Sequence, residues 1–199
     1  MYEKYGQFID GKWHKSSTGE TYEVINPANE EIIGKASKAS SEDVDKALLS
    51  AQKGLEVWKK TPPWQRAYIL RRIADKMREK QDILAKWMTL EVGKPFAEAK
   101  GEVNGAADIY EWNAEETKRI YGQTVESRFE DTRVHVYYQP VGVVAALVPW
   151  NFPLVLSARK ISTALAAGCS VIVKPDVITP GVVMEQVEIC RECGVPPGV

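Results

Sequence analysis

The sequence predicts an α/β protein built on a doubly wound parallel sheet. Every residue from 141 to 148 is apolar, which is typical of a strand covered on both faces. A helical pattern over 152–167 follows, then a short apolar strand over 170–173 and a second helix over 180–193. Strands that alternate with helices in this way indicate a parallel sheet with helices on its faces.

The first part of the chain is predicted to be mainly helical. Apolar residues recur there at the spacing of one helix face, and the segments begin and end at capping residues. The predicted helices are 44–58 with Ser40 or Ser41 as the N-cap, a second with Thr61 as its cap and Pro62 in its first turn, a third from about Asp82 to Gly93, and a fourth from Phe96 to Thr117 that ends near Tyr121.

Short strands are expected at two further places. Residues 7–13 form a strand that breaks at the Asp10-Gly11 turn, and 22–25 is expected to pair with it. Alternating residues over 132–139 predict a two-faced strand, with 124–128 as its partner. The second pair is therefore a candidate β-hairpin between the helical part and the sheet.

The composition is that of a globular protein and argues against several partners. Of 199 residues, 44% are hydrophobic, and 26 Lys and Arg against 27 Asp and Glu leave a net charge of −1. A chain without a basic excess is a poor binder of nucleic acid or anionic membranes, and 141–150, the longest apolar stretch, is too short to span a bilayer. Three cysteines and no apolar leader favour a reducing, cytoplasmic compartment.

Two polar segments directly follow the two predicted strands of the sheet. Ligands of open α/β sheets bind beyond the carboxyl ends of strands, where residues 149–153 and 174–176 are expected. Asn151 stands among bulky apolar residues and could donate its amide N–H to an oxyanion, although a turn with packed aromatics is the alternative. Lys174 is either a solvated loop lysine or a ligand of hydroxyl or phosphate groups. The sequence has no Gly-x-Gly-x-x-Gly, Walker or His-Glu-x-x-His motif, so a dinucleotide would bind without the usual glycines.

An ordered set of motifs, spread over essentially the whole chain, resembles the amino-terminal part of NAD(P)-dependent aldehyde dehydrogenases. The motifs are Ile9-Asp10-Gly11-Lys12-Trp13, Asn26-Pro27-Ala28, Glu91-Val92-Gly93-Lys94-Pro95, Pro140-Val141-Gly142-Val143, Pro149-Trp150-Asn151-Phe152-Pro153, Ala164-Leu165-Ala166-Ala167-Gly168-Cys169, Val173-Lys174-Pro175 and Gly194-Val195-Pro196-Pro197-Gly198-Val199. The segment 115–122 resembles the succinate-semialdehyde dehydrogenase branch.

The resemblance implies a Rossmann-like doubly wound parallel sheet, incomplete in this chain, with an amino-terminal helical region and a protruding β-hairpin. Residues 1–122 and 141–199 would be the amino-terminal part of the cofactor-binding domain, and 123–140 the hairpin of an oligomerisation element in a dimer or tetramer. The catalytic domain, with its nucleophilic cysteine and its glutamate, would lie beyond Val199. The alternatives are a truncated fragment that binds a nucleotide or an intact subunit, and a structural fragment without a ligand.

The resemblance also implies roles for particular residues, and no metal. The cofactor-binding residues would be Val148, Pro149, Trp150, Lys174, Pro175, Asp176 and Val177, with Lys174 on the adenosine ribose. A carboxylate at Asp176 would repel a 2′-phosphate, which favours NAD while NADP remains accepted. Asn151 would be the oxyanion donor for a small-molecule aldehyde.

Arg159 is the residue that is expected to determine the substrate preference. In succinate-semialdehyde dehydrogenases an arginine at the corresponding position binds the distal carboxylate of the substrate, so the resemblance implies a semialdehyde such as succinate semialdehyde. Spacing alone favours an arginine on a solvated helix face. The apolar residues around it argue against that interpretation, because an unpaired buried guanidinium is costly.

Overall fold

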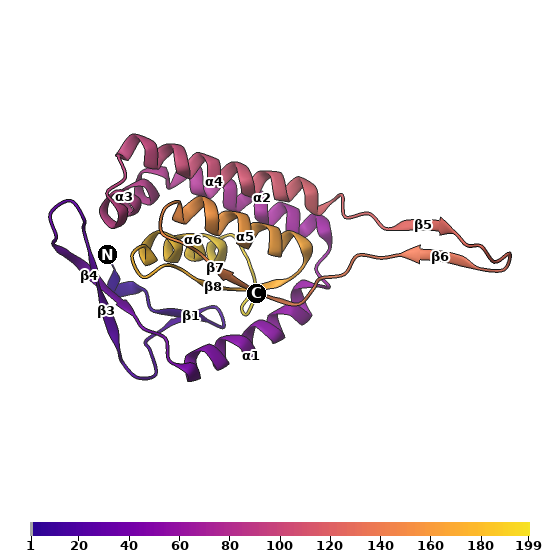
Figure 1. Cartoon of the computed structure of the whole chain (residues 1–199), viewed down its shortest axis with the longest axis horizontal. Helices are drawn as coiled ribbons and strands as arrows, with labels where there is room; N and C mark the ends of the chain where they lie inside the picture. Colours follow the sequence, from indigo (N-terminus) through magenta and orange to yellow (C-terminus); the bar gives the residue numbers. More distant parts are fainter. Residues whose placement is uncertain (1) are drawn as a thin grey trace.

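The computed structural model describes residues 2–199 and confirms the α/β class (Figure 1). In chain order the elements are a 3₁₀ turn (Tyr2–Lys4), β1 (Gln7–Ile9), β2 (Lys12–His14), β3 (Thr21–Ile25), β4 (Ile32–Ser37), α1 (Ser41–Trp58), α2 (Pro63–Glu79), α3 (Gln81–Val92), α4 (Phe96–Thr117), β5 (Gln123–Glu126), β6 (Arg133–Val136), β7 (Val143–Leu147), α5 (Pro153–Ala167), β8 (Ser170–Lys174) and α6 (Pro180–Glu192).

The predicted parallel strand pair is present. β7 and β8 pair in register from Val143 opposite Ser170 to Leu147 opposite Lys174, and α5 connects them. β7 is shorter than predicted and is not covered on both faces, since Ala146 is buried but Leu147 is 64% exposed. Within residues 2–199 the sheet has only these two strands, so much of β7 has nothing to pack against.

The core lies among the long helices rather than around the sheet. α4 packs against α2, α3 and α5, and Figure 1 shows α2 and α4 lying side by side. Four apolar residues at the spacing of one face of α2 are fully buried: Leu70, Ile73, Ala74 and Met77. It meets an α4 face rich in alanine, which lets the helices approach closely and leaves room for one large residue, Tyr110.

Two details of the predicted helices are wrong. Thr61 does not cap α2, because its hydroxyl donates to the carbonyl oxygen of Val57 at the end of α1; Pro62 is the N-cap and Pro63 opens the helix. The stripe on α1 is buried at Ala51 and Trp58, but Val44 is exposed and lines a groove. The N-cap prediction for α1 is confirmed, with Ser40 and Asp43 forming a capping box.

The pairing of the first strands also differs from the prediction. β3 pairs with β4 rather than with β1, because the turn after β3 is short: the Asn26 N–H donates to the carbonyl oxygen of Glu31 at 2.8 Å. β1 pairs with β2 across the Asp10-Gly11 turn, where both residues have positive φ, 53° and 76°. Each strand thus pairs with its nearest neighbour in sequence.

The predicted hairpin forms and stands apart from the rest of the chain. β5 and β6 are antiparallel, from Gln123 opposite Val136 to Glu126 opposite Arg133, and all eight residues are exposed. Figure 1 shows the ribbon extending well away from the helices. No helix within residues 2–199 combines the length and the apolar character needed to cross a membrane.

Candidate functional site

The ends of β7 and β8 bring the two predicted polar segments to one edge of the sheet. The Val148 N–H donates to the carbonyl oxygen of Lys174 at 3.0 Å, which extends the parallel ladder by one step. Because the strands run in the same direction, Pro149 to Asn151 and Lys174 to Asp176 leave the sheet at the same edge. The sequence prediction that these segments are neighbours is therefore confirmed.

Most side chains at this edge are open to a ligand. Pro149, Asn151 and Lys174 are exposed, and Trp150 is 49% exposed. Val148 is the exception: at 5% exposure its side chain belongs to the interior, and its backbone joins the strands. The Lys174 ammonium makes no hydrogen bond or ion pair with any residue from 2 to 199, so it is available to a ligand.

Asp176 organises the turn that leads from β8 into α6. Its Oδ1 accepts the Ile178 N–H at 3.0 Å, and its carbonyl oxygen accepts the Thr179 N–H at 3.2 Å. This is an Asx turn, in which a side-chain oxygen substitutes for a backbone acceptor. One carboxylate oxygen is therefore engaged within the turn.

A groove of about 920 Å³ lies beside β8, within the size range of ligand-binding clefts. Lys174, Pro175 and Val177 line it, together with residues of β1, α1, α6 and the segment 195–199. The sequence did not reveal this groove, because its walls come from segments that are far apart along the chain.

Buried carboxylates hold the first turns of both helices that follow the sheet strands. Glu102 of α4 accepts the N–H groups of Leu154 at 3.0 Å and Val155 at 3.2 Å, at the start of α5. Glu91 of α3 accepts those of Gly181 at 2.6 Å and Val182 at 3.1 Å, at the start of α6. Neither helix has a side-chain cap of its own.

Glu91 is fully buried, and burial raises the pKa of its carboxyl group to about 7. The two amides and the Tyr2 hydroxyl, which donates to Glu91 at 2.6 Å, act in the opposite direction and lower that pKa, but burial outweighs them. In the sequence, Glu91 is an acid on the apolar face of the predicted helix, which also carries Trp87 and Met88. The groups that bind its carboxylate could not be inferred from that pattern.

These caps bear on how a phosphate could bind. In the usual dinucleotide fold the N-terminus of the first crossover helix binds the pyrophosphate. Here the Glu102 carboxylate already binds the two backbone amides at that position on α5. The structure thus agrees with the missing glycine motif, because these two amides are not free to bind a phosphate.

Arg159 does not lie where its apolar neighbours suggested. It is exposed on α5, while Ala158 and Ile161 are buried. The expectation of a buried guanidinium is therefore wrong: the helix is apolar on the face that packs on α4, and Arg159 projects from another face. Within residues 2–199 its guanidinium remains accessible.

The three cysteines are free and buried. Burial raises the pKa of the Cys190 thiol to about 12, and its sulfur lies 3.6 Å from the Tyr110 hydroxyl. Burial also raises the pKa of Cys193. A good nucleophile needs a thiol that ionises near neutral pH, so burial argues against Cys190 and Cys193 as nucleophiles.

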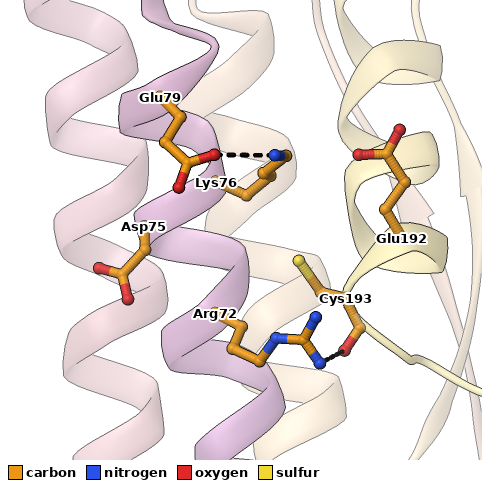
Figure 2. A pocket seen from close by; sticks show the side chains of 6 residues that line it. All are labelled: Arg72, Asp75, Lys76, Glu79, Glu192 and Cys193. Carbon is orange, nitrogen blue, oxygen red and sulfur yellow. Dashed lines mark hydrogen bonds and ion pairs between the residues drawn. The ribbon is translucent and has the colours of Figure 1, made fainter.

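A second pocket, of about 350 Å³, lies between α2 and the end of α6 (Figure 2). Figure 2 shows Arg72 donating to the carbonyl oxygen of Cys193 and Lys76 paired with Glu79. Asp75 and Glu192 also line it and pair with Arg78 and Lys80, which lie outside the lining, and none of the predicted site residues lines the pocket. Among residues 2–199 no cluster of three or more His, Cys, Asp or Glu side chains could hold a metal ion.

Comparison with known proteins places the chain in a family. The model of the aldehyde dehydrogenase family matches residues 13–199. Glutarate-semialdehyde dehydrogenase of Pseudomonas aeruginosa is 45% identical over 192 residues, which cover 96% of this chain and 40% of that protein. Succinate-semialdehyde dehydrogenase (NADP(+)) of Escherichia coli is 44% identical over 191 residues, with the same coverage.

The fold agrees with these matches. The crystal structure of a betaine aldehyde dehydrogenase point mutant from Staphylococcus aureus, in complex with NAD+, superposes with a TM-score of 0.95 at 34% identity, covering 98% of this chain and 40% of that one. The chain spans about 40% of the length of the curated relatives that it matches. On motifs, fold and sequence identity together, this chain belongs to the aldehyde dehydrogenase family.

Proposed function

We propose that the complete protein oxidises a small aldehyde to the acid with a nicotinamide dinucleotide, and that this chain supplies part of the cofactor crevice and one oxyanion donor. The observation that carries the proposal is the parallel pairing of β7 with β8, which brings Asn151 and Lys174 to one edge. Family membership supports the type of reaction.

The residues at this edge suit a dinucleotide. The free ammonium of Lys174 can donate to the adenosine ribose hydroxyls, the second carboxylate oxygen of Asp176 can accept from them, and Val177 adds apolar surface. Pro149 and Trp150, which do not line the groove beside β8, would form the other side of the crevice with their backbone. When bound, the nicotinamide accepts a hydride from the substrate.

We propose NAD as the cofactor, with NADP also accepted. Asp176 is the acid nearest Lys174 in the sequence, and a carboxylate there disfavours a 2′-phosphate. The Ile178 N–H, however, already donates to Oδ1 of Asp176. Only the other carboxylate oxygen is therefore left to repel a 2′-phosphate. Relatives of both kinds exist: one named for NADP(+) and one crystallised with NAD+.

Asn151 would act on the substrate carbonyl. Its segment is bounded by Pro149 and Pro153, which restrict the backbone before α5. The side-chain N–H would donate to the carbonyl oxygen as it becomes negative during attack by the nucleophile. None of the three buried cysteines can supply that nucleophile, so it would come from another part of the complete protein.

The substrate we propose is a semialdehyde that carries a carboxylate, succinate semialdehyde first and an oxo-acid homologue second. The guanidinium of Arg159 is exposed on the helix that begins just after Asn151, and in this proposal it binds the far end of a substrate held at Asn151. Planar guanidinium groups suit two carboxylate oxygens. The names of the relatives point to the same substrate class.

We also propose a division of the chain and an assembly. Residues 1–122 and 141–199 would belong to the cofactor-binding domain, and 123–140 would join subunits of a homo-oligomer, a dimer or tetramer, located in the cytoplasm. The exposure of all eight hairpin residues supports this, because an isolated two-stranded ribbon is marginally stable in water.

The crevice is tested by Lys174→Ala in the complete enzyme. Loss of a charged hydrogen bond of about 1.5–3 kcal/mol should raise the cofactor dissociation constant about 10- to 150-fold, measured by calorimetric titration. Lys35→Ala is the control, since this exposed lysine of β4 pairs with Glu23 on the surface and should leave binding unchanged. An unchanged constant for Lys174→Ala would remove Lys174 from the cofactor site.

A further inference from the structure

A buried ion pair lies directly under the segment that carries Asn151. Lys94 belongs to the link between α3 and α4, and its side chain is 10% exposed; Glu102, on α4, has a side chain 2% exposed. The Lys94 ammonium pairs with Oε2 of Glu102. The other carboxylate oxygen accepts the two backbone amides that open α5.

Lys94 also contacts the predicted donor segment itself. Its ammonium donates to the backbone carbonyl oxygen of Asn151 at 3.3 Å and lies 4.0 Å from the centre of the Phe152 ring. The carbonyl of Asn151 and the amides of Leu154 and Val155 are thus held by one ion pair. Both ends of this short segment are fixed from a single point.

The backbone around Lys94 explains why it can act as a fixed support. Gly93 ends α3 in the left-handed conformation, with φ 74°, and its N–H donates to the carbonyl oxygen of Thr89 at 3.0 Å. Pro95 is the N-cap of α4. Lys94 is therefore held between two helix ends, and its long side chain has little freedom to move away.

We propose that Lys94 and Glu102 are positioning residues that aim the Asn151 side chain. This rests on the proposed role of Asn151 as the oxyanion donor. An oxyanion donor is effective only when it is held in place before the reaction, so that no reorganisation is needed as charge develops. The ion pair holds the main chain that carries the donor. Lys94 and Glu102 would thus contribute to the active site without touching the substrate.

Lys94→Met in the complete enzyme tests the proposal, because methionine keeps the length of the side chain and removes the charge. We expect kcat to fall about tenfold, with the cofactor dissociation constant changed less than about twofold. Lys94→Arg should recover most of the loss. The double variant Lys94→Met with Glu102→Gln removes both charges, and the glutamine keeps an acceptor for the α5 amides. It therefore leaves no unpaired buried carboxylate that could cause misfolding by itself.

The control is Lys100→Met. Lys100 lies on α4, pairs with Asp82 at 2.7 Å and stands 5.5 Å from the centre of the Phe96 ring, so it has the same kinds of partner away from Asn151. Its replacement should leave kcat unchanged.

A double variant distinguishes positioning from general stability. If Lys94 acts through Asn151, Lys94→Met should lower kcat no further in an Asn151→Ala background. Losses that multiply in the double variant, or an unchanged kcat in Lys94→Met, would overturn the proposal.

Amide hydrogen exchange gives a readout that does not depend on activity. Lys94→Met should speed exchange over residues 151–156 and leave the start of α6 as in the wild type. Unchanged exchange there would also overturn the proposal. If Asn151→Ala itself retained full kcat, the proposed role of Asn151 would fail, and the exchange data would still show whether Lys94 holds the segment.

Discussion

Single carboxylates determine how the two helices after the sheet strands begin. Glu91 and Glu102 each accept two backbone amides from helices that lie far along the chain. An acid within an apolar stripe was visible in the sequence at Glu91, but the helix end that it meets is separated from it by 90 residues. Such partners are set by tertiary packing, which local pattern does not contain.

For Arg159, too, the local sequence pattern was insufficient, because it suggested burial that the structure does not show. The helix around it is apolar enough to suggest burial, yet the residue is exposed. Its proposed function therefore depends on accessibility rather than on the cost of burying a charge. In the complete enzyme, Arg159→Leu should lower kcat/KM for succinate semialdehyde by about 1.5–3 kcal/mol, about 10- to 150-fold, because a charged hydrogen bond is lost.

The control for Arg159→Leu is an uncharged aldehyde of equal length. Its kcat/KM should change much less, because it has no distal carboxylate to bind. Equal losses for the two substrates would mean that Arg159 supports the helix, and the carboxylate-bearing substrate would have to be abandoned.

At the scale of elements, the start of α6 should respond to pH. Glu91 has an ordinary pKa of 4.5 and a pKa of about 7 in the fold, so the folded chain favours its protonated form. Its contribution to stability is therefore complete below about pH 4.5 and is lost as pH rises through about 7. The hydroxyls of Tyr2 and Tyr22 are the titratable groups beside it, and both have raised pKa values, so they stay neutral in this range.

Glu91→Gln should remove this dependence, because glutamine does not titrate. Melting temperatures of the complete protein between pH 5 and pH 8 are the measurement. The wild type should have its largest advantage over Glu91→Gln at pH 5 and lose it toward pH 8. Curves that stay parallel across this range would show that Glu91 does not titrate there.

The hairpin is the second element with a testable role. Gly122 packs against the carbonyl oxygen of Val136, so the two ends of the hairpin lie close together and a short linker can join them. Replacing residues 123–135 by a short Gly-Ser linker should convert the oligomer to monomers in light scattering, since the proposed intersubunit strands are disrupted. A wild type that is already monomeric at micromolar concentration would contradict the assembly role.

For the molecule as a whole, local pattern predicted the sheet better than the site. The apolar run of β7, the helix over 153–167 and the short strand β8 were readable because each follows from its own residues. The pairing of β3 with β4 and the cap of α2 were missed, because the first depends on a short turn and the second on a competing hydrogen bond.

Exposed apolar side chains mark another place where local pattern and structure differ. Leu147, Trp150 and Phe152 are all exposed near the carboxyl edge of a sheet with two strands. The apolar run of β7 predicted a strand covered on both faces, and residues 2–199 cover only part of it. The chain spans about 40% of the length of the curated relatives that it matches.

Asn151→Ala in the complete enzyme tests whether this edge of the sheet participates in aldehyde oxidation. Loss of an oxyanion donor typically costs about a hundredfold or more in kcat. With succinate semialdehyde and saturating NAD, we expect such a loss, and a cofactor dissociation constant close to that of the wild type. A change in KM alone, with kcat preserved, would exclude the oxyanion role and leave Asn151 a binding or structural residue.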